Sequence, residues 1–137
     1  MRPSTRLREV IVRTNQSLVQ ANQDYVELEK LAMGDVSPEA VGARDVNGKL
    51  ADIMLVASAV TDHYTREIQN NPLRGPEYFE PMIPRVEKQY RKLEDMRGYQ
   101  AGARRHFEEA VRQRQQRAAT AASQSPNAIV QQPSSSR

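Results

Sequence analysis

A seven-residue spacing of apolar side chains runs through the first thirty residues and restricts that stretch to a helix. The stripe consists of Leu7, Ile11, Thr14, Leu18, Ala21, Tyr25, Leu28 and Ala32. Steps of four and three place these residues on one face of an α-helix, a pattern typical of helices that pack on other helices. Val12, Val19 and Val26 form a second stripe. We therefore predict a helix over residues 5–33 with a wide apolar face, ended by Gly34.

The most apolar stretch of the chain predicts a second helix over about residues 49–70. One face of this helix would carry Leu50, Ile53, Ala57, Val60, Tyr64 and Ile68. Met54, Leu55 and Val56 add apolar surface on its other faces, so we expect it to be contacted on more than one side. Residues 34–48 are predicted to form a connector. Ser37 and Pro38 favour a helix start there, but Gly42 and the pair Asn47-Gly48 are expected to keep that piece short or frayed.

A third helix is predicted over about residues 84–118, after a proline-rich connector at 71–84. Its apolar side carries Val86, Tyr90, Leu93, Met96, Ala103, Phe107 and Ala110. The pair Gly98 and Gly102 predicts a bend or a close helix contact. In the connector, Tyr78, Phe79, Met82 and Ile83 are expected to form an apolar lid across the end of the bundle.

These elements predict an all-α fold of three elongated helices, a helical hairpin plus a long third helix, either a bundle or coiled-coil-like. The low apolar fraction of 38% and the absence of Trp favour long helices with a thin core. Residues 1–118 would form a single helical domain. Residues 119–137, rich in Ala, Ser, Gln and Pro, are predicted to be a disordered, low-complexity tail. The pattern permits the third helix either to fold back or to project.

The charges are unevenly distributed along the chain. Residues 14–84 carry five basic and eleven acidic groups, whereas residues 85–117 carry ten basic and five acidic groups. Segments of opposite charge are expected to pair, either within one bundle or between chains.

Catalytic and metal-binding patterns are missing from the sequence. The chain has no cysteine, which excludes disulfides and cysteine-ligated zinc. His63 and His106 lack the Glu-x-x-His arrangement of a di-iron bundle and are interpreted as solvated surface residues. The sequence has no nucleotide-binding glycine motif and no Ser-nucleophile elbow. We therefore expect no enzyme activity, no cofactor, no metal and no small-molecule substrate.

The lengths of the apolar segments indicate where the protein is located. No apolar run reaches the length of a membrane span, and no apolar region of a signal peptide follows the N-terminal basic residues. We expect no membrane span and no signal-peptide-driven secretion. An intracellular, soluble protein of the cytoplasm, or one within a virus particle, fits this composition.

The leading functional hypothesis is a non-catalytic structural subunit that docks by helix–helix contacts in a larger multi-subunit complex. The partners would be other protein chains, in a homo- or hetero-oligomer, and a virion or phage particle component fits the description. The predicted docking residues are Leu50, Ile53, Met54, Val60, Tyr64, Tyr78, Phe79 and Met82.

The alternative hypothesis is an accessory protein that binds nucleic acid non-specifically through the Arg-rich third helix. Arginine side chains would neutralise phosphates, which makes the affinity salt-dependent and independent of base sequence. The predicted phosphate contacts are Arg97, Arg104, Arg105, Arg112, Arg114 and Arg117. Aromatic residues that could stack on bases are sparse near them.

Overall fold

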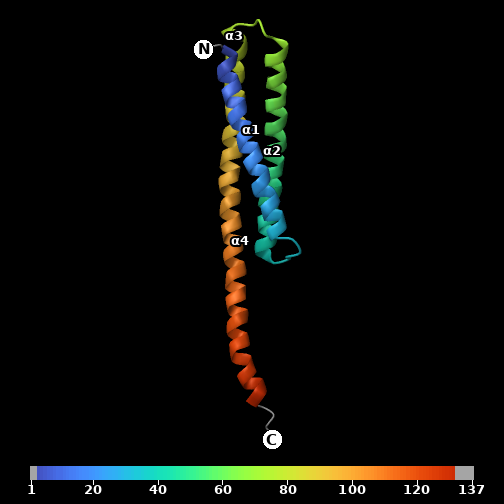
Figure 1. Cartoon of the computed structure of the whole chain (residues 1–137), viewed down its shortest axis with the longest axis vertical. Helices are drawn as coiled ribbons and strands as arrows, with labels where there is room; N and C mark the ends of the chain where they lie inside the picture. Colours follow the sequence, from blue (N-terminus) through green and yellow to red (C-terminus); the bar gives the residue numbers. More distant parts are fainter. Residues whose placement is uncertain (1–2, 132–137) are drawn as a thin grey trace.

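The computed structural model describes residues 3–131, with side chains described for residues 4–124. This part of the chain is all-α, as predicted. Its elements are α1 (Pro3–Leu31), α2 (Pro38–Asn70), α3 (Pro76–Phe79), the 3₁₀ turn η1 (Glu80–Met82) and α4 (Ile83–Gln131). In Figure 1, α1 and α2 form an antiparallel hairpin, and α4 runs beside both before projecting past the α1–α2 connection. Within residues 3–131, no helix combines the length and the apolar content needed to cross a membrane.

The heptad stripe predicted on α1 forms its buried face. Leu7, Ala21 and Leu28 are fully buried, and each belongs to a different apolar cluster along the bundle. The polar member of the stripe, Thr14, is also buried, and its hydroxyl donates to the carbonyl oxygen of Val10 at 2.8 Å. A buried hydroxyl with a partner costs little, so the interruption does not break the stripe.

The second helix begins eleven residues earlier than the sequence predicts, at Pro38 instead of residue 49. Ser37 caps it, because its hydroxyl accepts from the backbone N–H of Ala40 at 3.2 Å. The expectation that Asn47-Gly48 would fray this segment was wrong. Asn47 is fully buried, and its side-chain amide donates to the carbonyl oxygen of Tyr25 at 2.9 Å. A tertiary contact thus offsets the weak helix propensity of the pair.

Asn47 belongs to a buried polar network that joins all three long helices. Gln100 of α4 donates to the side-chain oxygen of Asn47 at 3.2 Å and to the carbonyl oxygen of Asp24 at 3.0 Å. The amide of Asn47 also donates to the carboxylate of Glu29 on α1 at 2.8 Å. Because each bond has a specific partner, sliding one helix past another would leave buried amides unpaired. The network therefore sets the register of the bundle.

The proline-rich segment closes one end of the bundle, as predicted. Phe79, Met82 and Ile83 are buried in the same cluster as Leu7 and Ile68. The hydroxyl of Tyr78 donates to the carboxylate of Glu67 at 2.9 Å, which raises the pKa of Tyr78. The segment is a structured connector between α2 and α4.

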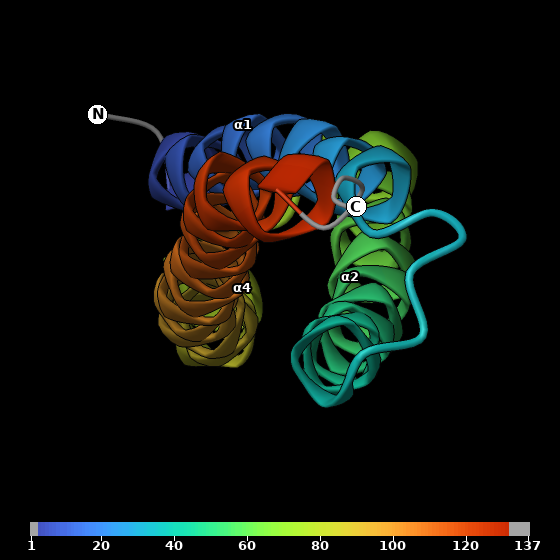
Figure 2. The same ribbon diagram turned by 90° about the horizontal axis from the view of Figure 1, so that it is seen from below.

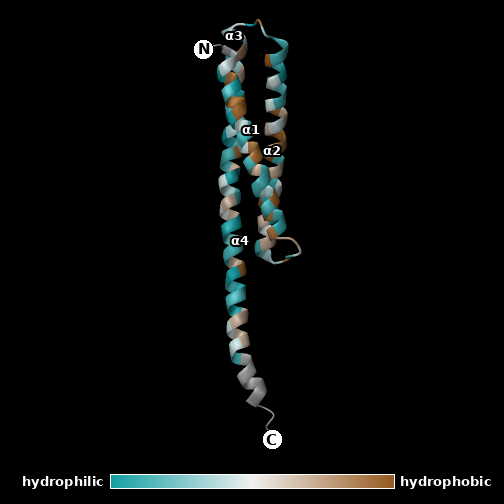
Figure 3. Ribbon diagram, viewed as in Figure 1, coloured by the Kyte–Doolittle hydropathy of each residue, from teal (hydrophilic) through white to brown (hydrophobic). Residues whose placement is uncertain are grey.

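Helix α4 both packs along the hairpin and projects from it. Arg114 is the last residue of α4 with an ion pair to the hairpin, and residues 115–124 are all exposed. The helix end predicted at residue 118 was wrong, because α4 continues to Gln131. Residues 118–122 include four alanines, the residue with the highest helix propensity, so this stretch does not need an apolar stripe to continue the helix. The rest of the predicted tail, residues 132–137, lies outside the described residues. Figure 3 shows that the projecting part is largely hydrophilic or neutral.

We predict that Asn47→Ala lowers the free energy of unfolding by about 2–3 kcal/mol, because it removes buried hydrogen bonds and leaves Gln100 without one partner. Urea unfolding followed by circular dichroism measures the loss. Asn15→Ala, at an exposed position of α1, is the control and is expected to change stability by less than about 0.5 kcal/mol. The losses of Asn47→Ala and Gln100→Ala should not add up in the double variant. Strict additivity would contradict the network.

Candidate functional site

The structure places half of the predicted docking residues inside the chain's own core. Neighbouring helices bury Leu50, Tyr64, Phe79 and Met82, so these side chains have little exposed surface left for a partner chain. Helix α4 and the lid cover the faces that a lone hairpin would leave open. Half-buried positions hold the other four, Ile53, Met54, Val60 and Tyr78. On α2, the apolar side chains that stay exposed are Leu55 and Val56, together with Val41 near its start.

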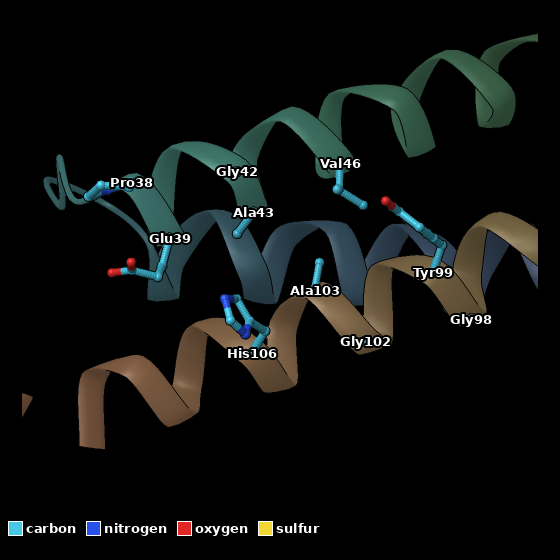
Figure 4. Close-up of a pocket in the computed structure, with 10 residues that line it drawn as sticks. All are labelled: Pro38, Glu39, Gly42, Ala43, Val46, Gly98, Tyr99, Gly102, Ala103 and His106. Carbon is cyan, nitrogen blue, oxygen red and sulfur yellow. The ribbon is translucent and has the colours of Figure 1, made fainter. Parts of the chain in front are cut away.

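A groove with a volume of about 670 Å³ lies between α2 and α4. Its walls are Pro38, Glu39, Gly42, Ala43 and Val46 of α2 and Gly98, Tyr99, Gly102, Ala103 and His106 of α4. In Figure 4, Val46 and Tyr99 point toward one another across the groove, and His106 faces the α2 wall near Ala43. Figure 2 shows α1 lying across one side of α2 and α4; no residue of α1 contributes to the described lining.

Glycines open both walls of this groove. A Cβ atom built on Gly42 or Gly98 would meet no atom of the described chain within 4 Å, apart from its own helix backbone and chain neighbours. At Gly102 it would meet only the end of the Arg105 side chain, at 3.8 Å. A glycine inside a helix costs about 1 kcal/mol relative to alanine. Packing within the described chain therefore does not require glycine at these positions.

The walls continue along the bundle in steps of seven residues. Ile53 and Val60 follow Val46 on the same line of α2, and both are half-buried apolar side chains. On α4, Lys92 precedes Tyr99 by seven residues, and both are exposed. Seven residues make almost two helical turns, so such residues share a face. One wall is therefore apolar, and the other becomes basic toward the lid.

Between the lid and the groove, α4 exposes Arg85, Lys88, Arg91 and Lys92, which we call the basic rim; Asp95, one turn further on, is also exposed. Among the described side chains, none of these four forms an ion pair with a carboxylate. Arg85 donates to the hydroxyl of Tyr64 at 3.3 Å, which raises its own pKa. Glu94 accepts a hydrogen bond from Ser17 of α1, on a different side of α4. The rim thus retains a positive charge that can attract an acidic group.

Four of the six arginines predicted to contact phosphate already pair with carboxylates of the chain. Arg97 lies 3.7 Å from Asp24, and Arg104 lies 2.8 Å from Glu27. Arg114 lies 3.2 Å from Asp35. The fourth, Arg112, pairs with Glu109 one turn earlier on α4. The acidic segment therefore pairs with the basic one within one bundle, whereas Arg105 and Arg117 form no ion pair among the described residues.

The described side chains contain no group of three or more His, Cys, Asp or Glu that could hold a metal ion. When compared with known proteins, the chain matches no family model, no curated protein and no solved structure.

We predict that acid unfolding depends on Glu94. Hydrogen bonding by Ser17, and then by Arg97, lowers the pKa of this carboxyl below its usual value. A lowered folded-state pKa stabilises the fold above the unfolded-state pKa, and this stabilisation is lost as the pH falls through the folded value. Glu94→Gln should lower stability at neutral pH and flatten its decline between about pH 5 and pH 3. Urea midpoints across this range measure the slope. Glu9→Gln, exposed on α1, should keep the wild-type slope; equal slopes for both variants would contradict the assignment.

Proposed function

We propose that this chain is a non-catalytic assembly subunit that binds an amphipathic helix of another protein in the groove between α2 and α4. The observation that carries the proposal is the open groove itself, with helical glycines on both walls and no described residue of the chain filling it. Small residues let a partner backbone approach closely, and a helix is the element that matches a groove between two parallel walls.

The partner helix would occupy the position of a fourth helix in the bundle. Four-helix bundles bury a central apolar layer from every member, whereas here α1 covers only one side of the α2–α4 pair. An incoming apolar stripe would contact Val46, Ile53 and Val60 on α2. Large side chains would enter beside Gly42, Gly98 and Gly102, where the hollow is about 670 Å³.

Charge complementarity defines the partner further. The basic rim on α4 would lie along one flank of the incoming helix. Acidic residues on that flank would be attracted, and basic residues would be repelled, by these exposed side chains. We therefore infer a partner helix with an apolar stripe and acidic residues beside it. A virion or phage particle is one kind of assembly that would use such a subunit.

The nucleic-acid alternative has less support. Phosphate binding through Arg97, Arg104 or Arg114 would have to break ion pairs that link α4 to α1 and its connection to α2. Arg105 and Arg117 alone would give a weak, salt-sensitive contact.

Two synthetic helical peptides with the same apolar stripe test the proposal, one flanked by Glu and the other by Lys. We expect the Glu-flanked peptide to bind more tightly and to shift the backbone amide resonances of Gly42, Val46, Tyr99 and Gly102. NMR titration of the labelled chain measures both effects. Weaker or absent binding of the Glu peptide, or shifts confined to other surfaces, would overturn the proposal.

Filling the groove is the matched mutational test. Gly42→Leu should weaken peptide binding at least tenfold while keeping the helical fold, because the new side chain occupies space left open by the described chain. Gly48→Leu is the control: Gly48 is also a helical glycine with open space around its Cβ in the described structure, but it does not line the groove. Isothermal titration calorimetry compares the two. Equal affinities would rule out this groove as the binding site.

A further inference from the structure

The outer side of α1 exposes a row of valines at seven-residue intervals. Val12, Val19 and Val26 are 53%, 62% and 38% exposed, respectively. They lie on a different face from the buried stripe that contacts α2 and α4. Single exposed apolar residues are ordinary on a protein surface, but a regular row on one helix face is not.

The neighbouring side of α2 extends this apolar surface. A hollow of about 430 Å³ lies between α1 and α2, with Leu55 at 74% exposure beside it. Its lining residues are Leu18, Asn22, Tyr25, Ala51, Met54, Leu55 and Ser58. We call Val12, Val19, Val26, Leu55 and this hollow the valine face.

The middle of the valine face lacks charged side chains, although Arg8 of α1 and Asp52 and Asp62 of α2 are exposed around it. Residues 10–26 of α1 include only two charged residues, Arg13 and Asp24. Both are directed at α4: the Arg13 guanidinium lies 5.7 Å from the centre of the Tyr90 ring, and Asp24 lies 3.7 Å from Arg97. Residues 53–61 of α2 contain no charged residue. Soluble surfaces usually carry charges throughout, and loss of charge at an apolar patch marks an interface core.

We propose that the valine face binds the valine face of a second copy of this chain across a two-fold axis. In a two-fold interface the same patch meets itself, so every charge near the axis would face its own copy and repel it. A patch without charge near the axis avoids this repulsion, whereas the basic rim of the α2–α4 groove would repel its own copy. The second copy is therefore the occupant that fits this face. The inference goes beyond the proposed function, because it concerns another face and another partner.

The uncharged middle of the face is large enough for a weak dimer. Residues 10–26 of α1 span about 25 Å at 1.5 Å per residue. Two neighbouring helices span about 20 Å, so the footprint is roughly 500 Å² per chain, about 1,000 Å² in total, at the lower end of specific interfaces. In this arrangement the exposed Leu55 of each copy enters the hollow between α1 and α2 of the other, as reciprocal contacts in a two-fold dimer do.

The mass of the purified full-length chain in solution tests this inference. We expect sedimentation equilibrium to give twice the chain mass at concentrations of about 100 µM, well above the micromolar dissociation constants of weak dimers. Val19→Glu and Leu55→Glu should each shift the protein to monomer with unchanged helicity, because both side chains are exposed in the single chain. Leu73→Glu is the control and should remain dimeric, since Leu73 is 97% exposed but lies outside this face.

A wild-type monomer at that concentration would overturn the inference, as would dimers that survive both Val19→Glu and Leu55→Glu.

Cross-linking gives an independent measurement, because the chain has no native cysteine. A short bismaleimide should join two copies of Val19→Cys and leave Leu73→Cys monomeric; equal cross-linking of both would contradict the two-fold contact. Gly42→Leu should not change the mass, so this inference and the helix-binding proposal fail separately.

Discussion

The hydrogen bond between Gln100 and Asn47 is the contact on which the arrangement of this bundle depends. It joins α4 to α2, and both amides also bond to α1. Apolar stripes tolerate a shift by one turn, because one aliphatic side chain can replace another, but buried amides do not. Gly98 lies two residues before Gln100, and Gly42 lies five residues before Asn47. Because α2 and α4 run in opposite directions, Gly42 and Gly98 lie on opposite sides of this contact along the groove, and the polar register fixes their spacing.

Electrostatics divides α4 into parts with different roles. From Arg97 to Arg114 the helix contacts acidic residues of α1 and of the segment that leads into α2. Closer to the lid, its basic residues lack such partners among the described residues and form the basic rim. Partly exposed ion pairs contribute little stability individually, but several along one helix fix which side of α4 faces α1. The same pairing removes most of the arginines that a phosphate-binding surface would need.

Two surfaces of the molecule differ in the partner that each can accept. The α2–α4 groove has small residues, an apolar wall and a basic rim, which favour a different molecule with acidic groups. The valine face is apolar and uncharged, which favours its own copy. Both surfaces include α2, the most apolar helix, and both follow from the same fact: three helices cannot cover every apolar face of α2. Used together, they would make a dimer that presents two grooves, an arrangement suited to assembly.

Local sequence rules were sufficient for much of this fold. The stripe from Leu7 to Ala32 determined α1, Gly34 and Pro72 mark where the long helices of the hairpin end, and the apolar residues around Phe79 determined the lid. The valine row was also visible as a pattern, although not its exposure. Tyr99 could have been found from its seven-residue spacing to Lys92 and His106.

Only the tertiary structure decided that Asn47-Gly48 lies inside a helix, that Gln100 is buried and that Leu50 and Tyr64 are core residues. The physical reason is that periodicity records which face of a helix is apolar, whereas the neighbour of that face depends on hydrogen bonds between residues far apart in the chain.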